Sequence, residues 1–203
     1  MTIRKGEAWG TAGGALPDGA PIIDGDRDLA EFVGRHCHDG HALAPVVGLV
    51  GGSLWRTVGG PGARGRLHTP DAVWLPVDIG RAVLDDRVHW FAAHVVVRRG
   101  RRWSVAMNAD WWHQYQLGPK AHPNDGLVDT YEAELGIREL LKIKKRAVNG
   151  SHLPHPAIRE RRLSHVVWHF DRGSACWVDD HRIAPDIRRI EISVVPDAAT
   201  IVI

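Results

Sequence analysis

The sequence predicts a mainly β protein of the α+β class, built as an antiparallel β-sandwich with two short helices. From residue 71 onward, runs rich in β-branched and aromatic residues alternate with polar breaks such as "LDDR" and "RGRR", which is typical of strands joined by hairpins. Near the C-terminus, "IEISVV" alternates apolar and polar residues, as a strand with one buried face does. Only residues 26–37 and 136–148 place apolar side chains at helical spacing.

The bulk composition excludes several classes of protein. The chain has 203 residues and a formal net charge of +2 at pH 7, too small to indicate a nucleic-acid-binding protein. No run reaches the ~18 apolar residues of a membrane span, and the first residues lack the apolar core of a signal peptide. The two cysteines, Cys37 and Cys176, are typical of free thiols in a reducing compartment. We therefore expect a cytoplasmic protein without a nucleic-acid partner.

The first 70 residues form a short mixed segment, and we expect residues 71–203 to form the β-sandwich domain. Within the first segment, "DRDLAEFVGRHC" predicts a helix that Gly40 can end, and "VVGLV" predicts a buried strand that leads into a glycine-rich loop. The side chains of His36, Cys37, His38 and His41 suit zinc, but their place at a helix end favours a solvated terminus.

The glycine-rich stretch "GGSLWRTVGG" is the first candidate site. Its glycines allow positive φ and close approach of the backbone, and an arginine with two hydroxyl groups beside them could hold an anion. The Walker spacing and its lysine are absent, so a tight turn after a buried strand is the alternative. The candidate nucleotide- or phosphate-binding residues are Gly51, Gly52, Ser53, Arg56 and Thr57.

Two turns rich in aspartate are the other candidates. In "CWVDDH", an aspartate beside a histidine could act as a general base for a hydroxyl group, although Asp-Asp also favours an ordinary turn. In "HPNDGLVDT", Asn-Asp-Gly is a turn signal, yet a carboxylate flanked by carbonyl oxygens also suits Mg²⁺ or Ca²⁺. The residues alone leave both alternatives open at each turn.

The order of these motifs resembles the C-terminal β-sandwich domain of the diacylglycerol kinase and sphingosine kinase superfamily, and above all its bacterial lipid kinases. That domain has a strand ending near Asn, a Pro-x-Ala segment, an Asp-Gly-Leu turn, a helix, a His- and Pro-containing loop, an Asp-Gly-Glu turn and a last strand. The corresponding stretches here are "AMNA", "PKAHPNDGLVDT", "LLKIKKRAVNGSHLPHPAI", "CWVDDH" and "IEISVVPDAATIVI". The resemblance covers residues 74–203, well over half of the chain.

The resemblance implies roles for particular residues. Asp125 matches the aspartate that helps to bind a divalent cation, Mg²⁺ or Ca²⁺, and the carbonyl groups of Leu127 and His122 would complete that site. Asp179 matches the aspartate that deprotonates the lipid hydroxyl group. Asp180 and His181 replace the glycine and glutamate of the family's motif, which makes Asp179 and His181 the candidate catalytic residues.

The N-terminal part departs further from the family, whose ATP-binding α/β domain carries a Gly-Gly-Asp-Gly-Thr loop. The residues before position 71 are too few for that domain, and Ser53 and Leu54 stand where the loop has aspartate and glycine. We therefore expect a lipid-kinase-like protein of reduced or partner-dependent activity that binds a lipid or a phosphorylated small molecule. The alternatives are an active ATP-dependent lipid kinase and a non-catalytic structural or interaction domain.

We also expect two kinds of partner, a second copy of the chain and a membrane surface. An exposed sheet edge would allow a homodimer to form by strand pairing. A protein that acts on lipids is also expected to contact a membrane peripherally.

Overall fold

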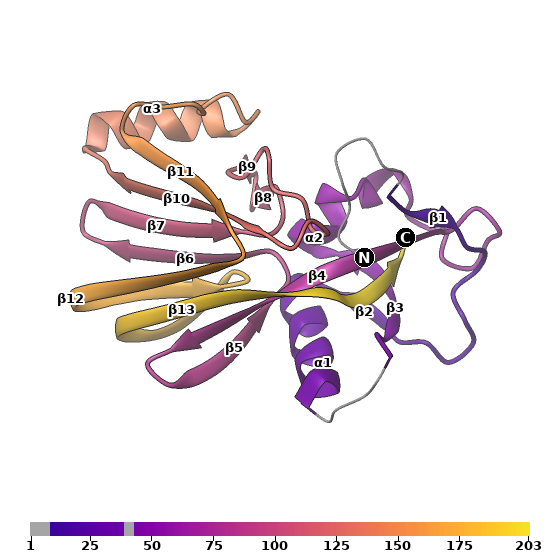
Figure 1. Cartoon of the computed structure of the whole chain (residues 1–203). Coiled ribbons are helices and arrows are strands. Elements are labelled where there is room, and N and C mark those ends of the chain that lie inside the picture. Colours follow the sequence, from indigo (N-terminus) through magenta and orange to yellow (C-terminus); the bar gives the residue numbers. More distant parts are fainter. Residues whose placement is uncertain (1–8, 39–42) are drawn as a thin grey trace.

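The computed structural model describes residues 9–38 and 43–203, and its main element is one curled sheet of 11 strands (Figure 1). The predicted α+β, mainly β class is confirmed. The two expected helices are present as α1 (Asp26–His38) and α3 (Ile137–Ala147). A third helix, α2 (Gly52–Thr57), lies where the sequence indicated only a glycine-rich loop. The predicted helix end at Gly40 lies outside the described residues.

Three long strands form the middle of the sheet: β4 (Val73–Leu84), β12 (His165–Val178) and β13 (His181–Val202). The strand order is β1-β4-β13-β12-β6-β7-β10-β11, with β5 attached to β4 and the pair β2–β3 attached to β13. A separate two-stranded ribbon joins β8 and β9. The remaining strands are β1 (Thr11–Ala12), β2 (Ile22–Asp24), β3 (Val46–Gly51), β5 (Arg87–Phe91), β6 (His94–Arg99), β7 (Arg102–Met107), β8 (Trp111–Trp112), β9 (Tyr115–Gln116), β10 (Val128–Glu134) and β11 (Ile158–Leu163).

Two strand boundaries differ from the sequence prediction. The run "HWFAAHVVVRR" reads as one strand, but β5 ends at Phe91 and β6 begins at His94. The backbone N–H groups of Ala92 and Ala93 donate to a side chain, that of Asp179, which interrupts the strand. The stretches "RLSHVVWHFD" and "SACWVDD" are predicted as separate strands, but His165–Val178 form the single strand β12, whose register against β13 shifts within it. Arg162 and Leu163 belong to β11 instead.

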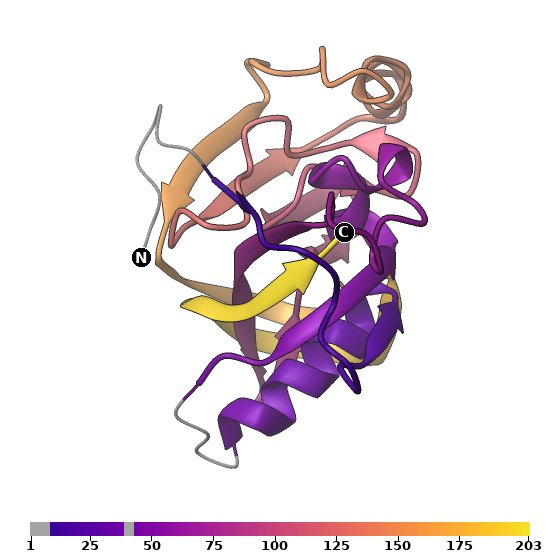
Figure 2. The ribbon, with the colours of Figure 1, turned by 90° about the vertical axis from the view of Figure 1, so that its right-hand side faces the viewer.

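The N-terminal segment joins the same sheet, by parallel pairing. β3 pairs with the C-terminal end of β13, β2 pairs with β3, and α1 connects these two strands (Figure 2). The continuous apolar run of β3 suits a strand that is covered on both faces, as strands in parallel pairing are. Leu29 and Val33 of α1 are fully buried in the core cluster that contains Val47 and Leu49 of β3. The antiparallel prediction therefore holds for the rest of the sheet but not at this end.

Helix α3 links β10 to β11 and lies at the outer side of the sheet (Figure 1). Its buried side chains are those of Ile143 and Ala147, so only one narrow face of the helix packs on the protein. None of the helices in the described parts of the chain combines the length and the apolar character needed to cross a membrane.

Candidate functional site

The turn between β12 and β13 holds Asp179, one of the predicted catalytic residues. Asp179 and Asp180 both have positive φ, 43° and 65°, and Val178 pairs with His181, which defines a two-residue hairpin. The Asp179 carboxylate points into the protein and accepts the N–H groups of Ala92 (2.6 Å), Ala93 (2.9 Å) and His94 (3.0 Å). The Asp179 side chain thus bridges the break between β5 and β6, and Asp179 is only 6% exposed.

The electrostatics of Asp179 follow from this burial. Loss of water raises the pKa of the Asp179 carboxyl, and the nearby negative charge of Asp26 raises it further. The positive charge of His94 and the backbone donors act in the opposite direction but do not outweigh burial. Asp179 is therefore a buried acceptor for the backbone, with a carboxyl group that holds a proton more readily than usual.

The neighbouring residue, Asp180, faces solvent and forms a second part of the site. Its Oδ1 atom lies 3.2 Å from Nε2 of the fully buried His94 and 3.4 Å from Nε2 of His113. The side chains of Asp180 and His113 are 38% and 57% exposed. Burial alone would raise the pKa of Asp180, but the hydrogen bond to His94 and the charges of both histidines lower it. Asp180 and His113 are thus the solvent-accessible members of this cluster, and the predicted residue His181 lies exposed at the start of β13.

His94 is held between acidic groups. Burial disfavours its charged form, but the hydrogen bond that its ring donates to the Asp180 carboxylate and the charges of Asp179, Asp180 and Asp26 together raise its pKa. The sequence prediction missed both His94 and His113. The apolar run around His94 and the tryptophans around His113 carry no local pattern that marks a site.

Asp26 interacts with both the glycine-rich loop and the cluster of Asp179, Asp180 and His94, so the loop lies next to that cluster. The Asp26 carboxylate accepts the N–H groups of Ser53 (2.5 Å) and Leu54 (2.9 Å) at the start of α2. Gly51 precedes the helix, and Gly52 has φ of 93°. A Cβ atom on Gly52 would lie 2.5 Å from Oδ1 of Asp26, so this position requires glycine. Burial raises the pKa of Asp26.

The remaining predicted phosphate-binding residues connect α2 to the ribbon of β8 and β9. The hydroxyl of Thr57 donates to the Ser53 carbonyl at 2.9 Å and accepts the Asp110 N–H at 2.9 Å. Arg56 stacks its guanidinium 3.4 Å from the centre of the Trp111 ring and donates to the His113 carbonyl at 3.1 Å. Arg56 is exposed, so this arrangement leaves a cation at the surface next to His113.

Asn108, which follows β7, organises the interior between the two aspartate turns. Its side-chain amide is fully buried and donates to the carbonyl groups of Asp78 (2.9 Å) and Ala92 (2.8 Å). Its backbone N–H donates to the Ala93 carbonyl at 2.8 Å. Asn108 therefore holds the same short segment whose N–H groups bind Asp179. The sequence marked only a strand ending near this asparagine.

The predicted divalent-cation turn has internal partners. Oδ1 of Asp125 accepts the Leu127 N–H at 3.0 Å, and Oδ2 pairs with the guanidinium of Arg162. Nδ1 of His122 accepts the Asn124 N–H at 3.3 Å. Among the described residues no group of three or more His, Cys, Asp or Glu side chains is placed to hold a metal ion. The predicted ligand set relies on two carbonyl groups, which leaves it a prediction.

The carboxylates near the predicted cation turn lie against a basic side chain, that of Arg162. Arg162 also pairs with Asp129 of β10 at 3.0 Å, so a single guanidinium is shared by two carboxylates. Asp129 therefore contacts the same guanidinium as Asp125. The zinc site that the sequence offered as an alternative near the end of α1 would include His41, which lies outside the described residues.

Asp78, which the sequence did not single out, anchors this turn from β4. Its fully buried carboxylate accepts the N–H groups of Gly126 (2.7 Å) and Asp197 (2.9 Å). Burial, and to a smaller degree the charge of Asp125, raises the pKa of Asp78 to about 6 despite these donors. The loss of hydration therefore raises the pKa of Asp78 by more than its hydrogen-bond donors lower it.

A pH-dependent stability difference is expected for Asp78→Asn. The folded state keeps the Asp78 proton up to about pH 6, whereas the unfolded state loses it near 3.8, so the wild type loses stability as pH rises between these values. The variant does not titrate there. Its deficit in unfolding free energy, measured by urea titration, should shrink by about 2 to 3 kcal/mol between pH 4 and pH 7. Val97→Ala, a core truncation without a titrating group, should keep a constant deficit, and a constant deficit for Asp78→Asn would contradict the assignment.

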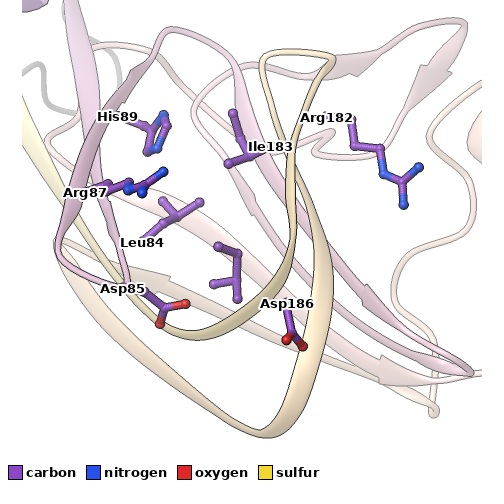
Figure 3. A pocket seen from close by; sticks show the side chains of 8 residues that line it. Leu84, Asp85, Arg87, His89, Arg182, Ile183 and Asp186 are labelled. Atoms are coloured by element: carbon purple, nitrogen blue, oxygen red, sulfur yellow. The ribbon is translucent and has the colours of Figure 1, made fainter.

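Two cavities lie away from these residues. One, of about 470 Å³, is lined by Leu84, Ile183 and Ile187 with charged groups from the β4–β5 turn and the first part of β13 (Figure 3). The other, of about 390 Å³, lies along β7, β10 and β11. None of the residues predicted from the sequence lines either cavity. The candidate site therefore lies apart from both of these cavities.

The fold is similar to that of solved structures described as diacylglycerol kinases. A "putative diacylglycerol kinase" from Bacillus anthracis str. Sterne has a TM-score of 0.60 at 13% identity, over 89% of this chain and 76% of that one. A diacylglycerol kinase from the same organism gives 0.54 at 11%, over 79% and 68% of the two chains. No protein-family model and no curated protein matches the sequence. At these identities the likeness concerns the fold.

Proposed function

We propose that this protein is a lipid-kinase-like protein of reduced or partner-dependent phosphotransfer activity, and that it binds a lipid or a phosphorylated small molecule. The observation that carries the proposal is the position of Asp26. Its carboxylate occupies the Ser53 and Leu54 N–H groups, the donors that a glycine-rich loop would offer to a phosphate. An internal carboxyl group thus competes with nucleotide for these donors, and Ser53 supplies no carboxylate for a metal ion.

The exposed groups around the loop support binding of an anionic ligand. Arg56 is exposed and is held in place by Trp111 and the His113 carbonyl. In this proposal Arg56 binds the phosphate group of the ligand, and the Asp180–His113 pair accepts the proton of a hydroxyl group if transfer takes place. Asp179 positions the pair by holding the segment before His94. In this proposal Mg²⁺ binds together with ATP. Asp125 and the carbonyl groups of Leu127 and His122 form a separate binding turn for a divalent cation.

Ligand binding and turnover test the proposal together. Dihexanoyl phosphatidic acid at ten times its Kd should raise the unfolding midpoint by about 3 to 6 °C, whereas Mg²⁺-ATP should raise it less. Arg56→Ala should weaken the phosphatidic acid effect, because the variant loses the exposed guanidinium. Arg172→Ala, an exposed arginine of β12, is the matched control and should behave as wild type. A midpoint unmoved by phosphatidic acid, dihexanoylglycerol and Mg²⁺-ATP would favour a structural domain and overturn the proposal.

The turnover measurement separates reduced from full activity. The assay contains Mg²⁺, labelled ATP and diacylglycerol in vesicles. We expect a rate at least ten-fold below the lower end of the ~1–100 s⁻¹ range that is typical of kinases. A rate within that range would show an active lipid kinase and contradict the inhibitory role given to Asp26.

A further inference from the structure

Helix α3 and the residue that follows it expose three large apolar side chains. Ile137 is 79% exposed, Leu141 63% and Val148, at the end of the helix, 53%. These residues follow one another at spacings of four and seven, so they form one stripe along the helix. The buried residues Ile143 and Ala147 lie on a different face, which leaves the exposed stripe beside the packed one.

Basic side chains flank this apolar stripe. The exposed basic residues of the helix outnumber its single acidic residue, Glu139, which lies near Nε2 of His155 at 3.8 Å. At 100° per residue, Lys144 lies on one side of the stripe and Arg138, Lys142 and Lys145 on the other. A helix with an exposed apolar stripe between basic groups suits the interface of a bilayer that carries anionic lipids.

The position of α3 places such a surface beside the candidate site. Nζ of Lys144 lies 5.4 Å from the centre of the Tyr115 ring in β9. β9 pairs with β8, which contains the Trp111 that carries Arg56, and both strands lie between α3 and α2 in Figure 1. A bilayer on α3 would therefore lie near the Asp180–His113 pair.

We infer that α3 is a membrane-surface helix that docks on bilayers with anionic headgroups, with Ile137, Leu141 and Val148 entering the interface and the flanking lysines and arginines meeting lipid charge. Charge complementarity favours an anionic bilayer over a second copy of the chain, because the basic groups around the stripe would repel one another across a symmetric contact between two copies. The inference rests on α3 alone and does not depend on kinase activity.

Vesicle co-sedimentation of the full chain, without nucleotide or diacylglycerol, tests this inference. Wild type should bind phosphatidylcholine vesicles that contain phosphatidylglycerol and bind pure phosphatidylcholine at least ~ten-fold more weakly. Arg138→Gln with Lys145→Gln should reduce binding by roughly ten-fold or more, and high salt should remove this difference. Ile137→Ser with Leu141→Ser should also reduce binding by about ten-fold, because the apolar contact is lost.

Matched controls use exposed residues elsewhere. Val88→Ser on β5, 47% exposed, and Arg172→Gln on β12 should bind as wild type. Equal binding to both vesicle types, or unchanged binding of either α3 double variant, would overturn the inference. So would a dimer in lipid-free solution that Ile137→Ser with Leu141→Ser converts to monomer, because a second copy would then cover the stripe. Retention of wild type on an acidic protein surface without vesicle binding would contradict it as well.

Discussion

Asn108→Asp is expected to lower the unfolding free energy by about 4 kcal/mol or more at neutral pH. The amide nitrogen of Asn108 donates to two carbonyl oxygens in a fully buried position. Aspartate removes both donors and places negative charge against both acceptors, without water to screen it. Guanidinium unfolding followed by tryptophan fluorescence measures the loss.

The comparison variants make this expectation specific. Asn108→Ala should lose about 3 kcal/mol, from two hydrogen bonds and a small cavity, and so should be more stable than Asn108→Asp. Asn149→Asp lies on the surface, where the side chain acts as an acceptor for Ser151, and should change stability little. If Asn108→Asp proved as stable as Asn108→Ala, the amide would not face the two carbonyl groups as described.

Asp179→Ala is expected to lose about 3 to 4 kcal/mol, whereas Asp180→Asn should lose less than about 1 kcal/mol. The alanine leaves three backbone donors without an acceptor in the interior. Asp180 is partly exposed, and water can replace much of what its carboxylate provides. Asp180→Asn should instead lower the pKa of His94, since the carboxylate raises it in the wild type.

Urea unfolding of both variants and an NMR titration of the His94 ring distinguish these roles. Asp179→Asn serves as the intermediate case, because one acceptor oxygen remains. Equal destabilisation by Asp179→Ala and Asp180→Asn, or an unchanged His94 pKa in Asp180→Asn, would show that the division between a positioning and a proton-accepting aspartate is wrong.

The local patterns of the sequence predicted those parts of the fold that depend on neighbouring residues. β-branched runs predicted most of the strands, and helical spacing predicted α1 and α3. The Asp179–Asp180 pair was expected as a turn, and its positive φ angles agree with the tolerance of aspartate for that region. Hydrophobic period and turn chemistry act over a few residues, which is the reason that they can be read without a structure.

The proposed site depends on contacts that no local pattern contains. Asp26 binds residues 27 and 28 positions away, and Asp179 binds backbone groups 85 to 87 positions away. Such bonds require that β12 pairs with β6 and that α1 packs beside β3.

The sequence by itself determined the mainly β class, the two longer helices and the places of both aspartate turns. Tertiary structure alone decided that Asp179 faces inward and Asp180 outward, and that Asp26 closes the glycine-rich loop. It also decided that the apolar stripe of α3 remains uncovered. The physical reason is that burial and hydrogen-bond partners are properties of the packed chain, whereas turn and strand preferences belong to short segments.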